Sequence, residues 1–198
     1  MFPESLETER LTFEPLHREN VDVFALHEVF GSGPNAEEVF EYVDFGPHQT
    51  IKETSDFIAR AEQQWEDREG AKYVVRPKAD EDGGRTIAGF TGLYPDWDRQ
   101  VATLGIVLGK RFWGRGYSGE RAELFVEVAF DRLDLAAVAV KYIDGNEASK
   151  RAIERYVDRF GGRYEGCLRN FLAVEDEVFD CHRYSISRAE YEEATGTN

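Results

Sequence analysis

The sequence predicts a mixed α/β fold of the α+β kind, with a central, mostly antiparallel sheet and helices on its two faces. Strand-like runs over residues 72–76, 86–94 and 100–109 are separated by turn-rich connections of hairpin length. Amphipathic helical patterns lie before and after these runs. No Pro/Gly/Ser-rich linker divides the 198 residues, so a single domain over residues 1–198 is expected.

The first half of the chain supplies one strand and two helices ahead of these runs. Leu11 and Phe13 alternate with polar residues and predict an opening strand. A short helix is expected from about Asn20 to Phe30, followed by a loop over 31–49 in which 36–42 has the pattern of a helical turn. A longer helix is expected from Thr50, with Gly70 as its stop.

The second half alternates helices and strands. A glycine-containing turn at 111–119 leads into a helix that begins near Gly116. A strand over 136–143, a helix over 146–160 and two closing strands over 167–174 and 178–186 follow. The sheet is therefore expected to hold about seven strands.

Composition narrows the function classes. The formal net charge is −15, with 39 acidic residues against 24 basic ones, and such a surface repels nucleic-acid phosphates. Six Lys against eighteen Arg, together with this acidity, also fit adaptation to high salt. No run approaches the length of a membrane-spanning helix, and no secretory pattern opens the chain. A cytoplasmic protein from a halophilic source is the resulting hypothesis.

The cysteines and histidines give no metal site. Cys167 and Cys181 lie in separate strand-like segments without a second ligand pair at metal spacing, and buried free thiols are expected. The four histidines show no spacing typical of metal binding or of a catalytic triad.

The turn at 111–119 carries most of the functional information. It lies between an apolar strand and a helix, where glycines and the helix N-terminus create a site for an anion such as phosphate. Read as G-x-G-x-x-G from Gly114 to Gly119, with Asp144 ending the next strand, it would be a dinucleotide site. Two features disfavour a dinucleotide site. The preceding strands are joined by hairpins, and four residues separate Gly109 from Gly114, whereas the dinucleotide motif follows its strand almost directly.

Read instead as Arg111-x-x-Gly114-x-Gly116, the turn resembles the acyl-coenzyme A loop of the GNAT superfamily of N-acetyltransferases. Further segments are similar, in order, to landmarks of the branch that acetylates ribosomal-protein N-termini: 9–16, 104–109, 146–149, 165–169 and 180–184. The resemblance covers nearly the whole chain, least well at 31–49. It implies a GNAT-like fold in which the fourth and fifth strands splay apart.

The resemblance also implies the activity and a set of binding residues. The expected activity is acetyl transfer from acetyl-CoA to a primary amine, either a protein N-terminus or a small molecule. Main-chain groups of Ile106, Val107 and Leu108 would pair with the pantetheine arm, and N–H groups from Trp113 through Ser118 would meet the pyrophosphate. The pyrophosphate-binding residues, with two flanking arginines, would be Arg111, Trp113, Gly114, Arg115, Gly116, Tyr117 and Ser118. The Trp113 side chain is expected in the core.

Catalytic groups are less well defined by the resemblance. It implies an oxyanion-stabilising N–H near Val107, and Ser149 as the partner of the leaving thiolate, unless this serine caps the helix. The family's usual tyrosine position is Ile153 here, and Tyr156, one turn on, is the second candidate. Asn146 is expected to contact the cofactor, to cap the helix, or both.

A general base is missing from the expected strand position, which is Thr103. The general base could instead be Asp96, Asp98, Glu14 or a water relay. For this reason a catalytically silent acyl-CoA-binding domain stays open as an alternative. The resemblance also suggests a homodimer formed through the closing strands.

Overall fold

The computed structural model describes residues 1–31, 33, 35–82, 86–174 and 177–197. The chain forms two compact units: unit 1 holds residues 1–94 and 105–117, and unit 2 holds residues 95–104 and 118–198. Hydrogen bonds order the eight strands β1-β2-β3-β4-β5-β6-β8-β7. Strand β5 (Val101–Leu108) contributes its first half to unit 2 and its second half to unit 1.

Unit 1 is built on an antiparallel meander. Its other strands are β1 (Leu6–Glu7), β2 (Leu11–Pro15), β3 (Ala71–Pro77) and β4 (Gly89–Asp96). The registers Leu6↔Phe13, Phe13↔Val75 and Tyr73↔Thr91 make each neighbouring pair antiparallel. This pattern excludes a dinucleotide-binding fold, which needs parallel strands joined by crossover helices.

The two longest helices of unit 1, α1 (Val23–Phe30) and α3 (Ile51–Glu66), begin at side-chain caps. The unit also holds α2 (Ala36–Phe40), α4 (Ala79–Asp82) and the 3-10 turn η1 (Lys110–Phe112). Asp22 accepts from the Ala25 N–H at the start of α1, and Thr50 accepts from the Glu53 N–H at the start of α3. Each cap satisfies a backbone donor that has no partner within the helix.

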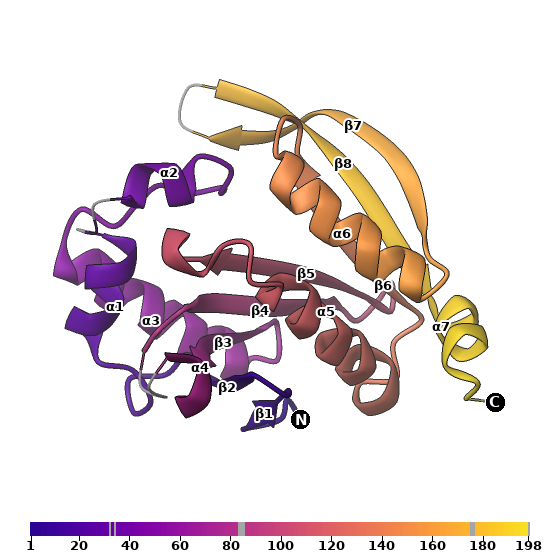
Figure 1. Cartoon of the computed structure of the whole chain (residues 1–198), viewed down its shortest axis with the longest axis horizontal. Coiled ribbons are helices and arrows are strands. Elements are labelled where there is room, and N and C mark those ends of the chain that lie inside the picture. The colour runs from indigo at the N-terminus through magenta and orange to yellow at the C-terminus, as the bar shows by residue number, and fades with distance from the viewer. Residues whose placement is uncertain (32, 34, 83–85, 175–176, 198) are drawn as a thin grey trace. The chain divides into compact units, whose positions relative to one another are not determined.

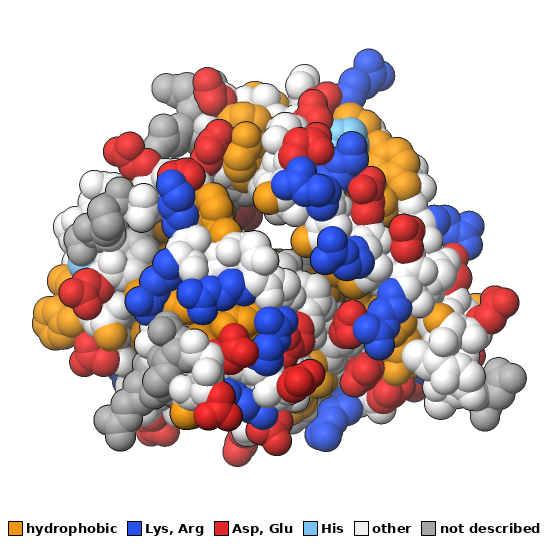
Figure 2. Space-filling view, viewed as in Figure 1, with side chains coloured by type: hydrophobic (Ala, Val, Ile, Leu, Met, Phe, Trp, Pro, Cys, Tyr) orange, Lys and Arg blue, Asp and Glu red, His pale blue; other side chains and the backbone are white. Residues whose placement is uncertain are grey.

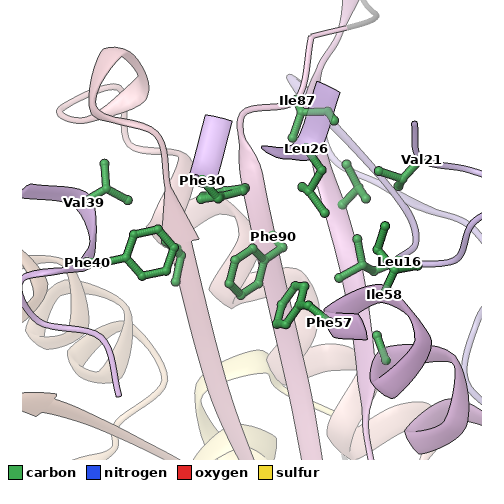
Figure 3. Packing of buried hydrophobic residues seen from close by; sticks show 13 residues of the cluster. Leu16, Val21, Leu26, Phe30, Val39, Phe40, Phe57, Ile58, Ile87 and Phe90 are labelled. Carbon is green, nitrogen blue, oxygen red and sulfur yellow. The ribbon is translucent and has the colours of Figure 1, made fainter. Parts of the chain in front are cut away.

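An aromatic core holds unit 1 together (Figure 3). The Phe57 and Phe90 ring centroids lie 5.0 Å apart, and those of Phe30 and Phe90 lie 5.1 Å apart. Burying one such ring contributes roughly 1.5–3 kcal/mol to folding. Val107 of β5 belongs to the same cluster, so the core fixes the segment that leads into the glycine turn.

Unit 2 combines the first half of β5 with the strands and helices of the second half of the chain. Helix α5 (Tyr117–Glu127) starts on the last residue of unit 1 and continues as the π-helical segment η2 (Val128–Arg132). The elements that follow are β6 (Ala137–Ile143), α6 (Glu147–Arg159), β7 (Arg163–Val174), β8 (Glu177–Ser187) and α7 (Arg188–Thr195). The long β7–β8 hairpin pairs with β6 through β8, and α6 packs against β6 and β8 (Figure 1).

Strands β5 and β6 form the parallel pair within unit 2. Their register runs from Val101↔Ala137 to Leu104↔Val140. Both strands therefore end toward the same edge, where Asp144 follows β6 and leads into α6.

The sequence predictions hold for the fold class and for the order of the long elements. The features that were not predicted are the two-residue β1, the one-turn α4, the 3-10 turn η1, the π-helical end of the α5 region, and α7. The α3 helix ends at Glu66 rather than at Gly70, because Arg68 adopts a left-handed conformation with φ 63°.

Acidic and basic side chains are interspersed on the face seen in Figure 2. No helix within the described ranges is long and apolar enough to cross a membrane. Both cysteines are free thiols. Cys181 is buried as expected, but Cys167 is exposed, which corrects the prediction that both are buried.

Candidate active site

The second half of β5 leads into the candidate site with alternating side chains. Val107 is 9% exposed and points into the aromatic core, whereas its neighbours Ile106 and Leu108 are only partly buried. Alternation along the strand places these two neighbours on the opposite face. This is the segment whose main-chain groups the sequence predicted to pair with a pantetheine arm.

The chain then turns through η1, which Phe112 anchors. Phe112 is 1% exposed, and its N–H donates to the Gly109 carbonyl over 2.9 Å. The Trp113 N–H donates to the Lys110 carbonyl over 3.1 Å. Because this donor is already satisfied, Trp113 is a weaker candidate for a backbone phosphate contact than the residues after it.

The Trp113 side chain is not in the core, contrary to the sequence prediction. It is 43% exposed, and its indole N–H donates to the Leu108 carbonyl over 2.7 Å. An indole on the surface keeps its single donor satisfied in this way while its ring covers the turn.

Two glycines after Trp113 adopt conformations that side chains rarely take. Gly114 has φ 75° and Gly116 has φ 82°. A β-carbon on Gly114 would meet no atom within 4 Å, so backbone conformation, not crowding, selects glycine there. Within the described part of the chain, no acceptor is assigned to the N–H groups of Gly114, Arg115 and Gly116.

Arg10 and Tyr117 fix the far end of the turn. The Arg10 Nη1 donates to the Arg115 carbonyl over 2.9 Å, and its guanidinium lies 5.1 Å from the centroid of the Tyr117 ring. Tyr117 is 1% exposed and donates its hydroxyl to Glu81 over 2.8 Å. Burial and this hydrogen bond raise the pKa of Tyr117. Only its backbone N–H is therefore placed to meet a ligand.

Positive charge flanks the turn. The exposed guanidinium groups of Arg111 and Arg115 lie 4.5 Å and 5.3 Å from the centroid of the Phe112 ring. Contact with an aromatic face orients a guanidinium without neutralising it. Both side chains add positive charge beside the turn, which favours an anion there.

The start of α5 adds the last element of the turn. Its first residues are Tyr117 and Ser118, and the N–H groups of the first turn of a helix have no carbonyl partner within that helix. The helix dipole adds partial positive charge at the same end. The turn can therefore bind a phosphate group through backbone donors.

In unit 2, Asn146 rather than Ser149 caps α6. The Asn146 Oδ1 accepts from the Ser149 N–H over 2.9 Å. Ser149 is partly exposed in the first turn of the helix. The Ser149 hydroxyl therefore does not cap the helix, which was the structural alternative to a catalytic role for this residue.

Tyr156 faces inward. It is 2% exposed, and no described group accepts or donates a hydrogen bond at its buried hydroxyl. Burial raises the pKa of Tyr156, and the positive charge of Arg121 only partly opposes this effect. A proton donor for a leaving thiolate needs access to it, so this placement argues against the second thiolate candidate.

The carboxylates considered as a general base have other partners or lie in turns. Glu14 pairs with the Arg76 guanidinium over 3.1 Å. Asp96 accepts from the Arg99 N–H over 3.0 Å, and Asp98 is an exposed turn residue. Thr103 in β5 has no proton-accepting carboxylate.

Three of the histidines take part in hydrogen-bond networks. The sequence did not reveal these networks, because most of their members are distant along the chain. His27 and His48 both contact the Thr54 hydroxyl, over 2.9 Å and 3.0 Å. His182 lies between Tyr164 and Asp144. The described residues include no group of three or more His, Cys, Asp or Glu side chains arranged to hold a metal ion.

Comparison with known proteins identifies relatives over nearly the whole chain. The family model of the acetyltransferase (GNAT) domain matches residues 10–156. The chain is 24% identical to the uncharacterized N-acetyltransferase p20 of Bacillus licheniformis over 189 residues, which span 95% of this chain and 98% of that protein.

Solved structures share the fold. A GCN5-related N-acetyltransferase from Brucella melitensis matches with a TM-score of 0.80 at 24% identity, over 99% of this chain and 84% of that one. The ribosomal-protein α-N-acetyltransferase RimL matches with a TM-score of 0.76 at 16% identity, over 93% and 94% of the two chains. The order of strands and helices and the match to residues 10–156 lead to one conclusion: the chain belongs to the GNAT family of acetyltransferases.

Proposed function

We propose that this chain transfers the acetyl group of acetyl-CoA to a primary amine, on a protein N-terminus or a small molecule, within a single catalytic domain of residues 1–198. The observation that carries the proposal is the turn from Gly114 to Gly116. Its left-handed glycines lie directly before a helix N-terminus and between two cationic side chains. GNAT domains use acetyl-CoA as their cosubstrate, and its pyrophosphate is the anion that such a turn suits.

The donor would be held mainly by main-chain groups. The N–H groups of Gly114, Arg115, Gly116, Tyr117 and Ser118 would donate to the pyrophosphate, and Arg111 and Arg115 would add charge. The main chain of Ile106, Val107 and Leu108 would pair with the pantetheine arm as a strand does. The Leu108 carbonyl keeps one lone pair for this pairing, since the Trp113 indole uses the other. Asn146 caps α6 and would also contact the donor.

The chemistry requires a group that takes a proton from the amine, a donor to the oxyanion and a donor to the leaving sulfur. The neutral amine nitrogen attacks the thioester carbon and gives up a proton, the C–S bond breaks as the tetrahedral intermediate collapses, and the sulfur gains a proton, so that the coenzyme leaves as a thiol. The Val107 N–H would stabilise the oxyanion, and the Ser149 hydroxyl would donate toward the sulfur. We assign no such role to Tyr156, whose hydroxyl is buried.

Thiol release in the presence of an amine tests the proposal. The panel contains tripeptides with N-terminal Ala, Ser or Met, spermidine, ethylamine and 2,2,2-trifluoroethylamine. Coenzyme A is followed with a thiol reagent, and the acetylated amine is identified by mass spectrometry. The proposal expects equal amounts of thiol and acetylated amine for at least one acceptor. The proposal would be contradicted if calorimetry detects no binding of acetyl-CoA and no amine of the panel is acetylated.

A second candidate, a catalytically silent acyl-CoA-binding domain, is favoured by Thr103 in the strand position of a base and by the buried Tyr156. The two functions differ in one outcome. Tight binding of acetyl-CoA without thiol release from any member of the panel would favour the binding domain.

We also propose that the protein works in the cytoplasm of an organism adapted to high salt. A net charge of −15 and only six Lys support the salt adaptation, because concentrated salt screens the repulsion between carboxylates. An acidic surface would also attract a cationic acceptor.

A further inference from the structure

A hydrogen-bonded chain of three side chains lies on the sheet of unit 2. The Tyr164 hydroxyl is 2.8 Å from the His182 Nδ1, and the His182 Nε2 is 3.1 Å from the Asp144 Oδ1. The exposed fraction is 48% for Tyr164 and 21% for the His182 side chain. Tyr164 therefore connects the imidazole to the surface of the unit.

Strand pairing brings these residues together from distant parts of the sequence. His182 on β8 is the partner of Tyr142 on β6, and their rings stack with centroids 4.9 Å apart. Tyr164 on β7 pairs with Tyr184, two residues from His182 along the same face. Asp144 directly follows β6, and its N–H donates to the Asp180 carbonyl over 2.9 Å. The β7–β8 hairpin (Figure 1) thus carries Tyr164 and His182, and the pairing of β8 with β6 brings Asp144 to them.

The partners of His182 fix its tautomer. An ionised carboxylate can only accept hydrogen bonds, so Asp144 requires the proton of the neutral imidazole to be on Nε2. Nδ1 is then an acceptor, and the Tyr164 hydroxyl donates to it. This order, in which a tyrosine donates to a histidine held by an aspartate, allows a proton that reaches the tyrosine oxygen to be passed inward.

Building on the function proposed above, we propose that Tyr164 is the catalytic residue that deprotonates the acceptor ammonium, with His182 as the proton store and Asp144 as a positioning residue. The tyrosine oxygen takes a proton from the ammonium while its own proton moves to Nδ1 of His182. The ammonium becomes a neutral amine with a free electron pair, and the imidazole becomes an imidazolium next to the Asp144 carboxylate. No other reactant is needed.

The location suits this role. Asp144 lies two residues before Asn146 and five before Ser149, in the connection where β6 passes into α6. The relay and the proposed thiolate donor therefore start from the same connection within unit 2. The base is supplied by the closing strands and not by Thr103 in β5.

Charged and titratable groups around His182 favour a cation. Asp144 and Asp180 contribute negative charge, and the Asp180 Oδ2 accepts from the Cys167 thiol over 3.8 Å. Partial desolvation and the carboxylates of Asp180 and Asp144 raise the pKa of the Cys167 thiol. On the α6 side, Tyr142 contacts the imidazole, and Glu154 accepts from the Tyr184 hydroxyl over 3.0 Å. The carboxylates around the relay attract a cationic amine.

The test compares two acceptors of similar shape. Ethylamine is almost fully protonated at pH 7.5, as lysine is, whereas 2,2,2-trifluoroethylamine is largely neutral and needs no base. Tyr164→Phe and His182→Gln are expected to lower kcat/KM for ethylamine about 10²-fold, the usual contribution of a general base, and to leave the value for trifluoroethylamine little changed. Tyr191→Phe is the matched control, because it removes a different tyrosine hydroxyl of unit 2, one that donates to Asp131 and not to a histidine.

A pH profile separates catalysis from a structural role. With a tripeptide acceptor, the loss in Tyr164→Phe should shrink as the pH rises past the pKa of the α-amine, about 7.7–8.0. Asp144→Asn should shift the profile without abolishing acetyl-CoA binding. Equal losses for both small amines, or a loss that does not change with pH, would overturn the relay alone. If the unmodified chain releases no thiol with any amine, the proposed function fails first, and the relay with it.

Discussion

Replacement of Gly116 by glutamate tests the anion-binding turn. Gly116 has φ 82°, and an L-residue in this region costs about 1–2 kcal/mol. The new β-carbon would lie 3.4 Å from the Arg10 Nη2, the flexible end of a side chain that can move. The carboxylate would add repulsion of up to about 4 kcal/mol against a phosphate charge about 4 Å away near the surface. We expect the Kd for acetyl-CoA to rise about 10²-fold or more.

Calorimetric titration measures this change, with two variants as controls. Gly161→Glu introduces the same charge at a similar conformation, φ 68°, in the connection between α6 and β7, and should bind acetyl-CoA as the unmodified chain does. Gly116→Ala separates backbone strain from charge. The loss in Gly116→Glu should shrink as salt is added, because salt screens exposed charges. Equal affinities of Gly116→Glu and Gly161→Glu, both folded by circular dichroism, would refute the assignment of the turn.

Further predictions concern stability. Asn146→Ala removes the cap of α6 and should cost about 1 kcal/mol, seen as a Tm lower by roughly 2–4 °C, whereas Asn146→Asp should keep the cap. A β-carbon on Gly89 would lie 2.0 Å from the Val107 carbonyl oxygen, so Gly89→Ala should destabilise the fold by about 1–3 kcal/mol in urea titrations. The hydrogen bond from Arg18 lowers the pKa of Glu62 in the folded chain. This hydrogen bond stabilises the fold at pH values above the pKa of Glu62 in the unfolded chain, and the stabilisation is lost as the pH falls through the pKa in the folded chain. The urea midpoints of the unmodified chain and Glu62→Gln should therefore converge below about pH 4. Finally, the urea midpoint should rise with added KCl, and full stability in low-salt buffer would contradict salt adaptation.

Much of the fold could be predicted because local signals agreed with the tertiary structure. The helix after Thr50 was found from its apolar stripe, and the meander was found from its turn residues. The α7 helix was missed although its signal is present. Ser187 and Glu190 form a capping box, but the helix exposes mostly polar residues and lacks the apolar stripe that reveals α3.

The sequence alone predicted only the part of the site that one contiguous segment forms. The turn from Arg111 to Ser118 is one contiguous segment, so its spacing alone indicated an anion site. The exposure of Trp113 was not predictable, because it depends on the Leu108 carbonyl being in reach of the indole. Tyr164, His182 and Asp144 are brought together by strand register, and this information is absent from residue spacing.

The structure of the complex with acetyl-CoA tests the central claim most directly. The account predicts pyrophosphate oxygens about 3 Å from the N–H groups of Gly114, Arg115 or Gly116, with the thioester on the side of Ser149. Pyrophosphate bound away from this turn, or a donor whose sulfur lies remote from the start of α6, would contradict it.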